Sequence, residues 1–264
     1  MKDILEEIVA HKRVEVAQQK AVVPAQALYS KVDAELLNGG RTPLSMRNAL
    51  ATSSTGIIAE FKRKSPSKGW INQEAEVDKV VAAYEQNGAS AISILTDEQF
   101  FGGQMRFITR VRESVGIPIL RKDFIIDEYQ LYQARLIGAD AVLLIAACLT
   151  PDLCRSLAAK AHELGLETLL EVHSESELAY VGDNVDMVGV NNRNLGTFHT
   201  DVQNSFRLAE LLPHDKLLVS ESGISNPDTL KALRQSGFRG FLIGETFMKT
   251  SDPGQSLNDF ISQL

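Results

Sequence analysis

The chain has 264 residues, of which 44% are hydrophobic, so it can bury a full core in one large domain or in two small ones. Its formal net charge of −7 argues against a nucleic-acid binder or a membrane-surface protein, because both need a basic surface. The first stretch, MKDILEEIVAHKRVEVAQQK, is charged throughout, so we expect no signal peptide, and no apolar run is long enough to cross a bilayer. Cys148 and Cys154 are interpreted as buried thiols of a reducing compartment, which predicts a cytoplasmic protein.

Residues 1–48 precede the first predicted strand. Ile4, Ile8, Val14 and Val16 give an approximate apolar face that is interrupted by charged residues. This pattern favours a helix over a disordered leader. We therefore expect an N-terminal helical extension that closes one end of the main fold.

Short β-rich apolar runs then alternate with segments of helical periodicity, which is typical of βα units and a parallel sheet. The helical segments include 76–87, 128–138 and 152–164. Eight strands in a chain of this length predict a (β/α)8 TIM barrel, with 1–264 as a single domain. A doubly wound open sheet is the alternative, but Phe61-Lys62-Arg63-Lys64 is not the glycine-rich turn that it normally shows after its first strand. The predicted strands are 56–61, 89–95, 117–121, 141–145, 168–172, 187–190, 217–220 and 240–243.

Charged or polar residues end nearly every predicted strand, although the strands themselves are apolar. Glu60 and Lys62 are two apart, so their side chains point to the same side, into the barrel. A single polar residue at a strand end has an ordinary structural explanation, but buried charges are costly unless they are paired. A ring of them at the carboxyl ends of barrel strands therefore indicates an active site. The other strand ends carry Thr96-Asp97, Lys122-Asp123, Glu171, Asn191-Asn192-Arg193, Glu221-Ser222-Gly223 and Gly244-Glu245.

The last two strand ends also predict a phosphate site. Ser222-Gly223 and Gly244-Glu245 are small-residue turns in the positions where barrels of this class often bind phosphate through backbone N–H groups. Ser65 and the cations Lys62 and Lys68 are expected to lie opposite them. A phosphorylated small molecule is thus the expected substrate.

The five histidines show no ligand spacing, so we expect no metal site. His173 follows Glu171 and is predicted to point to the opposite face of its strand. It is therefore not expected to belong to the site.

The sequence resembles the indole-3-glycerol phosphate synthase family of tryptophan biosynthesis over nearly its whole length. The motifs that carry the resemblance include ILEEIVAHKRVEV, IIAEFKRKSPSKG, SILTDEQFFGG, ILRKDFIID, GADAVLLIAA, LLEVHSESEL, VGVNNRNLGTF, VSESGIS and FLIGETFMK. Small departures occur at Glu128 and at Thr246-Phe247, neither of which is a candidate catalytic residue. We expect no phosphoribosylanthranilate isomerase domain after the barrel, as in the single-function form of the family.

The resemblance implies the reaction and the residue roles. The implied substrate is 1-(2-carboxyphenylamino)-1-deoxyribulose 5-phosphate, which closes into an indole ring with loss of carbon dioxide and water. The resemblance also implies that no cofactor is required. Lys122 matches the general acid and Glu171 the base, while Glu60 and Lys62 match a second carboxylate–ammonium pair. The further implied contacts are Asn191, Arg193, Phe101, Phe124 and Glu221 for the substrate, and Ser65, Ser222, Gly223, Gly244 and Glu245 for the phosphate.

Two other functions stay open at this point. An Amadori-type isomerase on the same barrel is expected to place a cysteine or aspartate acid–base pair at its strand ends, and Cys148 and Cys154 are poorly placed for that. A non-catalytic phosphometabolite-binding barrel is expected to have lost Lys122, Glu171 or Glu60, and all three are present. We expect no nucleic-acid or membrane partner, and a monomer, with a weak dimer as the alternative.

Overall fold

The computed structural model describes residues 4–194 and 196–264, and within them eight parallel strands form a closed barrel. The first and last strands pair with each other, with Ile57 opposite Phe241 and Ala59 opposite Ile243, so this sheet has no edge. The predicted TIM barrel is confirmed, and the doubly wound open sheet is wrong. In spatial order the strands are β1 (Ile57–Phe61), β10 (Phe238–Ile243), β9 (Leu217–Glu221), β8 (Met187–Asn191), β7 (Glu167–Val172), β6 (Ala141–Ile145), β5 (Ile119–Lys122) and β4 (Ala91–Leu95).

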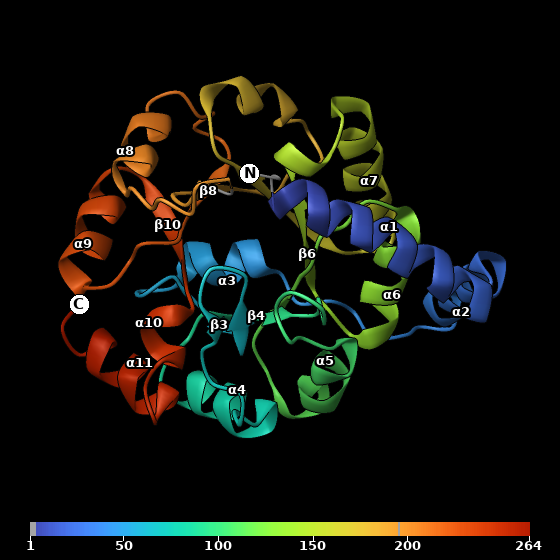
Figure 1. Ribbon diagram of the computed structural model, residues 1–264, viewed down its shortest axis with the longest axis horizontal. Helices are drawn as coiled ribbons and strands as arrows, with labels where there is room; N and C mark the ends of the chain where they lie inside the picture. Colours follow the sequence, from blue (N-terminus) through green and yellow to red (C-terminus); the bar gives the residue numbers. More distant parts are fainter. Residues whose placement is uncertain (1–3, 195) are drawn as a thin grey trace.

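Helices form a ring around the barrel (Figure 1). Side-chain caps fix several of their starts: the side chains of Asp127, Thr150 and Asn226 accept hydrogen bonds from the N–H groups of the first turn. Gly138 ends α6 in the left-handed conformation that glycine adopts without strain, with φ 90°. The ring consists of α4 (Val77–Gln86), α5 (Met105–Val111), α6 (Glu128–Ile137), α7 (Pro151–Glu163), α8 (Gln203–Ala209), α9 (Pro227–Gln235), α10 (Glu245–Met248) and α11 (Pro253–Ile261), with 3-10 turns η1 (Arg112–Ser114), η2 (Ala146–Cys148) and η3 (Glu175–Tyr180).

The N-terminal extension contains three helices rather than the single helix expected, and they lie at different places. α3 (Met46–Thr52) packs Met46 and Leu50 into the barrel interior, and its first turn is held by Glu167 at the start of β7, so α3 closes the amino ends of the strands. α1 (Ile4–Val22) lies instead at the carboxyl ends, and α2 (Ala25–Leu37) packs outside the ring against α6 (Figure 1). Residues 1–3 of the expected extension lie outside the described residues.

Two apolar cores meet at the barrel wall. One lies between the strands and the surrounding helices, and the other fills the barrel interior. Ile58, Leu120, Leu169 and Val219 belong to the interior core. Because side chains alternate along a strand, residues two positions further on face the same interior space at the carboxyl end. This alternation brings the candidate site residues together.

Within the part of the chain that the structure describes, no helix is long and apolar enough to cross a membrane.

Candidate active site

A cluster of buried charges occupies the mouth formed by the carboxyl ends of the strands. Lys122 Nζ lies 3.5 Å from Glu171 Oε2 and 3.5 Å from Glu221 Oε2. Lys62 Nζ lies 2.6 Å from Glu60 Oε1. The structure thus brings the four predicted catalytic residues and Glu221 into one site, with Lys122 between two carboxyl groups.

Two glycines leave the space that these carboxyl groups occupy. A Cβ atom at Gly244 would lie 2.3 Å from Glu60 Oε1, and a Cβ atom at Gly189 would lie 2.2 Å from Glu221 Oε1. Any larger residue would therefore displace the carboxyl group that packs against it. Gly244, which follows β10, therefore has a second role besides the predicted approach of a phosphate: it leaves room for the Glu60 side chain at the mouth of the barrel.

The buried charges shift one another's pKa values in different directions. Burial opposes ionisation of Glu171, but Lys122 and then His173 outweigh it and hold the pKa of Glu171 well below its ordinary value. Burial of Glu221, reinforced by Glu171 and Glu60 and only partly offset by Lys122, raises its pKa to about 8. The site therefore holds one carboxylate and one carboxylic acid on either side of a single ammonium at neutral pH. Such a pair of separated pKa values is typical of acid–base catalysis.

Lys122 and Glu60 keep their charges for the same reason. Burial opposes the charged form of Lys122, but Glu221, Glu171 and Glu60 together raise its pKa above the ordinary value. Burial likewise opposes ionisation of Glu60, whereas Lys62 and Lys122 lower its pKa. Lys122 is thus an ammonium that has protons to donate, and Glu60 is a carboxylate.

Two adjoining pockets open on this cluster. The first is here called the apolar pocket, and the second is called the polar pocket. Five residues line both of them, so the charged cluster forms their junction: Glu60, Lys62, Lys122, Arg193 and Ser222. The apolar side chains of the first pocket are Ile4, Leu5, Ile8, Pro66, Leu95, Phe101, Phe124, Leu143, Ile145 and Phe198.

The predicted aromatic residues lie together in the apolar pocket. The ring centroids of Phe101 and Phe124 are 5.8 Å apart at an interplanar angle of 36°. Phe198, which sequence reasoning missed, also lines this pocket and has a φ of 58°, a left-handed backbone conformation that is unusual for a bulky residue. A second aromatic plane would fit against these rings.

The polar pocket contains four of the five predicted phosphate residues: Ser222, Gly223, Gly244 and Glu245. Ser222 and Gly223 both have positive φ, 68° and 79°, so the turn after β9 is strained at its serine. Ser65 is not brought to this pocket. Its buried side chain lies in the wall of the apolar pocket, so its contact with phosphate stays a prediction.

Asn191 and Arg193 lie at the end of β8, as predicted. Asn191 Oδ1 accepts a hydrogen bond from the backbone N–H of Arg193, and Arg193 Nη2 lies 3.7 Å from Glu245 Oε2. Glu245 Oε1 also pairs with Lys68 Nζ at 2.5 Å. The carboxylate of Glu245 thus binds two cations of the polar pocket.

The prediction that His173 points away from the site is wrong. Leu169, Glu171 and His173 are each two residues apart, and the first belongs to the interior core, so all three face the same side. His173 Nε2 lies 3.2 Å from Glu171 Oε1, and its Nδ1 lies 3.4 Å from Glu177 Oε2. Burial opposes a charge on His173, but its contacts with Glu171 and then Glu177 raise its pKa to about 10.

The charge run after β1 divides into two parts. Lys62 and Lys68 line the polar pocket, whereas Arg63 donates to the carbonyl of Gly102 and Lys64 to the carbonyl of Gln99. The last two cations therefore hold the neighbouring loop and take no part in the pockets. The same stretch of chain forms a short hairpin of β2 (Lys64–Ser65) and β3 (Gly69–Trp70).

Among residues 4–194 and 196–264, no group of three or more His, Cys, Asp or Glu side chains is arranged to hold a metal ion.

A closed (β/α)8 barrel with a cluster of buried acidic and basic side chains at the carboxyl ends of its strands is typical of a TIM-barrel enzyme. The family model for indole-3-glycerol phosphate synthase matches residues 5–260. The chain belongs to the indole-3-glycerol phosphate synthase family, the decarboxylating lyases of tryptophan biosynthesis.

Individual relatives agree with the family model. The chain is 60% identical to the indole-3-glycerol phosphate synthase of Bacteroides thetaiotaomicron over 264 residues, which cover 100% of both chains. It is 40% identical to that of a Polaromonas species over 258 residues, 97% of each chain. Among solved structures, the tryptophan synthase α2β2 complex of Pyrococcus furiosus contains a similar fold, with a TM-score of 0.59 at 14% identity over 80% of this chain and 98% of that one.

Proposed function

We propose that the mouth of the barrel binds 1-(2-carboxyphenylamino)-1-deoxyribulose 5-phosphate across its two pockets and closes the indole ring. The observation that carries the proposal is the junction: Lys122 and Lys62 border an apolar pocket on one side and a polar pocket on the other. The parts of the substrate follow the same order as the apolar pocket, the junction and the polar pocket: an aryl ring at one end, the reacting carbons in the middle and a phosphate at the other end. Bound in this way, its ribulose carbonyl lies beside the charged cluster.

Ring closure joins the aryl carbon that bears the carboxylate to the ribulose carbonyl carbon. Lys122 donates a proton to the carbonyl oxygen, which becomes a hydroxyl group as the carbon–carbon bond forms. Loss of carbon dioxide then returns the bonding electrons to the ring and restores its aromaticity. Lys62, held by Glu60 at 2.6 Å, pairs with the substrate carboxylate until that step.

Dehydration completes the indole. The new hydroxyl leaves as water when a proton reaches its oxygen, and a base removes a proton from the neighbouring ring CH2 group, the former C1 of the ribulose, so that the second double bond of the five-membered ring forms. Glu171 is the proposed base, since its lowered pKa keeps it ionised. Glu221, a neutral acid at pH 7, donates a hydrogen bond to a sugar hydroxyl without adding a negative charge beside an anionic substrate. Asn191 and Arg193 bind the remaining hydroxyls and the carboxylate.

The phosphate is proposed to bind in the polar pocket. Backbone N–H groups of the turns at Ser222-Gly223 and Gly244-Glu245 are its donors, with Lys68 and Arg193 as cations. The anthranilate ring packs against Phe101 and Phe124 in the apolar pocket.

A monomer is proposed as the active unit. We also propose that the barrel and its N-terminal helices fold as one domain, because α1 and α3 contribute to the core of the barrel interior. A cytoplasmic location is proposed from the metabolic substrate.

Turnover tests the proposed function directly. The purified chain is incubated with the carboxyphenylamino-deoxyribulose phosphate, and indole fluorescence is followed. We expect product formation in proportion to enzyme. The absence of product at every enzyme concentration would contradict the assignment.

A further inference from the structure

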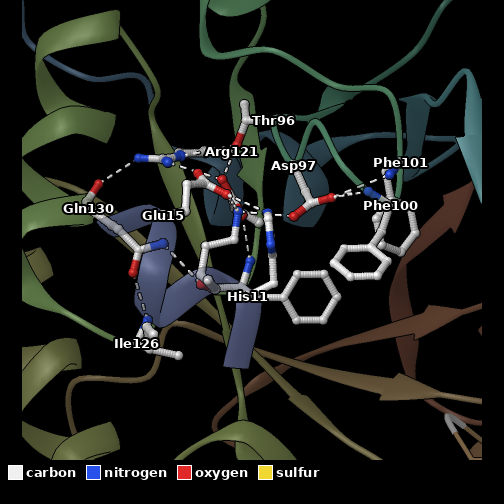
Figure 2. A network of polar contacts seen from close by, with 12 residues as sticks. His11, Glu15, Thr96, Asp97, Phe100, Phe101, Arg121, Ile126 and Gln130 are labelled. Atoms are coloured by element: carbon white, nitrogen blue, oxygen red, sulfur yellow. Dashed lines mark hydrogen bonds and ion pairs between the residues drawn. The ribbon is translucent and has the colours of Figure 1, made fainter. Parts of the chain in front are cut away.

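A buried lysine, Lys12, joins α1 to the rim of the barrel. Figure 2 shows the surrounding network of polar contacts, in which Glu15, Asp97 and Arg121 are labelled. The side chain of Lys12 is fully buried, and its Nζ lies 3.0 Å from Asp97 Oδ2, 2.9 Å from Asp123 Oδ1 and 2.8 Å from Glu15 Oε2. Asp97 follows β4 and Asp123 follows β5, so one ammonium bridges two neighbouring strand ends. Burying a charge costs desolvation free energy, so a buried ammonium group is stable only where charged partners hold it tightly.

Both aspartates also hold the backbone of the apolar pocket. Asp97 Oδ1 accepts hydrogen bonds from the N–H groups of Phe100 and Phe101 at 2.8 and 3.3 Å. Asp123 Oδ1 accepts one from the N–H of Phe124 at 2.8 Å. The two carboxylates that bind Lys12 are therefore the groups that orient the loops carrying both predicted aromatic contacts.

The helix that carries Lys12 contributes the facing wall of the same pocket. Ile4, Leu5 and Ile8 of α1 line it, and Ile8 lies one turn before Lys12 on the same face of the helix. Lys12 thus connects three parts of one pocket: the apolar helix face, the loop of Phe101 and the loop of Phe124.

The remaining contacts of the cluster hold the aspartates unequally. Asp123 Oδ2 also accepts from Thr96 and Arg121, at 2.5 and 3.0 Å. Within the described residues, Lys12 is the one cation paired with Asp97. Loss of Lys12 would leave Asp97 as a buried carboxylate without a counter-charge, and the loop of Phe101 would respond first.

We propose that Lys12 is a positioning residue of the apolar pocket, which sets the affinity for the aryl end of the substrate by fixing α1 against Asp97 and Asp123. The proposal rests on the proposed function, in which this pocket receives the anthranilate ring. Lys12 touches neither pocket itself and acts through the residues that it holds.

The test compares Lys12→Met with Lys20→Met. Methionine keeps the length and apolar stem of lysine but removes the charge. Lys20 lies on the same helix and pairs with Asp127 at 2.7 Å, away from both pockets, so its variant controls for the loss of an ion pair of α1. The readouts are KM and kcat for the substrate, the inhibition constant of inorganic phosphate and the melting temperature.

For Lys12→Met we expect KM to rise by roughly ten-fold to a hundred-fold, as for a misplaced binding group. The inhibition constant of inorganic phosphate should stay within about two-fold of wild type, because the polar pocket does not depend on α1. Lys20→Met should leave both constants unchanged. If KM of Lys12→Met equals that of wild type well below its melting temperature, Lys12 is only a stabilising residue and the proposal is overturned.

A second variant covers the case in which Lys12→Met does not fold. Lys12→Met combined with Asp97→Asn removes the unpaired charge but keeps the oxygen that accepts from Phe100 and Phe101. KM for the double variant should exceed that of Asp97→Asn alone, and equal values would overturn the proposal. If the wild-type enzyme shows no turnover, the proposed function is contradicted instead. Failure of the Lys12 proposal and failure of the proposed function are therefore distinguishable.

Discussion

The imidazole of His173 lies between two carboxylates, with Nε2 3.2 Å from Glu171 Oε1 and Nδ1 3.4 Å from Glu177 Oε2. Burial opposes the imidazolium, but these two carboxylates raise its pKa to about 10, so it is charged at neutral pH. A positive ring beside the proposed base favours the ionised form of that base. This relationship leads to the first prediction.

His173→Asn should move the acidic limb of the kcat/KM profile to higher pH. In the wild type the pKa of Glu171 lies below its ordinary value, so the carboxylate is lost only as the pH falls through that low value. Without the imidazolium the pKa of Glu171 rises, and the carboxylate is lost earlier on acidification. His162→Asn is the control, since His162 pairs with Asp186 outside both pockets. Coincident acidic limbs for wild type and His173→Asn would contradict this role.

Ionisation of Glu221 should produce the alkaline limb of the profile of kcat/KM against pH. Its pKa is raised to about 8, mainly by burial, so the group is neutral below that pH and becomes an anion as the pH rises through it. The anion repels a substrate that carries a carboxylate and a phosphate, and kcat/KM should therefore fall above about pH 8. Glu221→Gln keeps a neutral side chain at every pH and should lose this limb while it retains activity below it. An unchanged alkaline limb in the variant would assign the ionisation to another group.

Lys122→Met separates chemistry from binding. If Lys122 is the general acid, kcat should fall by roughly a hundred-fold to ten-thousand-fold, the usual range for one positioned acid or base. The contacts of both pockets with the aryl ring and the phosphate remain, so affinity for a non-reacting analogue should change little. Lys79→Met, at an exposed ion pair, is the control. Collapse of analogue binding with kcat preserved would make Lys122 an anchor and transfer the acid role to Lys62.

Gly244→Ala should impair Glu60. The added Cβ atom would lie 2.3 Å from Glu60 Oε1, so the carboxylate must shift and its contact with Lys62 is disturbed. We expect a fall in kcat with a destabilisation of about 1–3 kcal/mol, the usual cost of overpacking. Gly182→Ala, where an added Cβ atom meets nothing within 4 Å, is the matched control. Wild-type kcat in Gly244→Ala would show that the position of Glu60 is unimportant.

Glu245→Gln should tighten phosphate binding. The carboxylate now pairs with Lys68 and Arg193, at 2.5 and 3.7 Å, and it would repel a bound phosphate in the same pocket. Because Lys68 is largely exposed, its ion pair is worth about 0.2–1 kcal/mol. Release of both cations should lower the inhibition constant of inorganic phosphate by roughly two- to five-fold. Glu76→Gln, at an exposed pair with Lys79, is the control, and weaker phosphate inhibition in Glu245→Gln would contradict the role of its side chain.

The strand-end pattern was sufficient to predict which residues meet at the mouth. Glu60, Lys122 and Glu171 each follow an apolar strand of the barrel, and alternation along a strand fixes the side to which they point. The error at His173 came from applying that same rule with the wrong parity. Correctly applied, it would have placed the imidazole beside Glu171.

The contacts of α1 could not be predicted from the sequence. Lys12 lies 85 residues before Asp97 and 111 before Asp123 in the sequence. The helical pattern of α1 does not indicate which end of the barrel it covers. A lysine in a mixed charged helix is also usually exposed, whereas Lys12 is fully buried. Its burial is a consequence of tertiary packing rather than of local pattern.

The pairing of β1 with β10 has a consequence for biosynthesis on the ribosome. Ala59 pairs with Ile243, and the residues that follow them, Glu60 and Gly244, lie against each other. The position of the Glu60 carboxylate therefore depends on the end of the last strand. A nascent chain that has not yet released residue 244 carries every acid and base of the cluster but still has an open sheet at its first strand. We therefore expect the site to be complete only after β10, the last of the eight strands, has paired with β1 and closed the barrel.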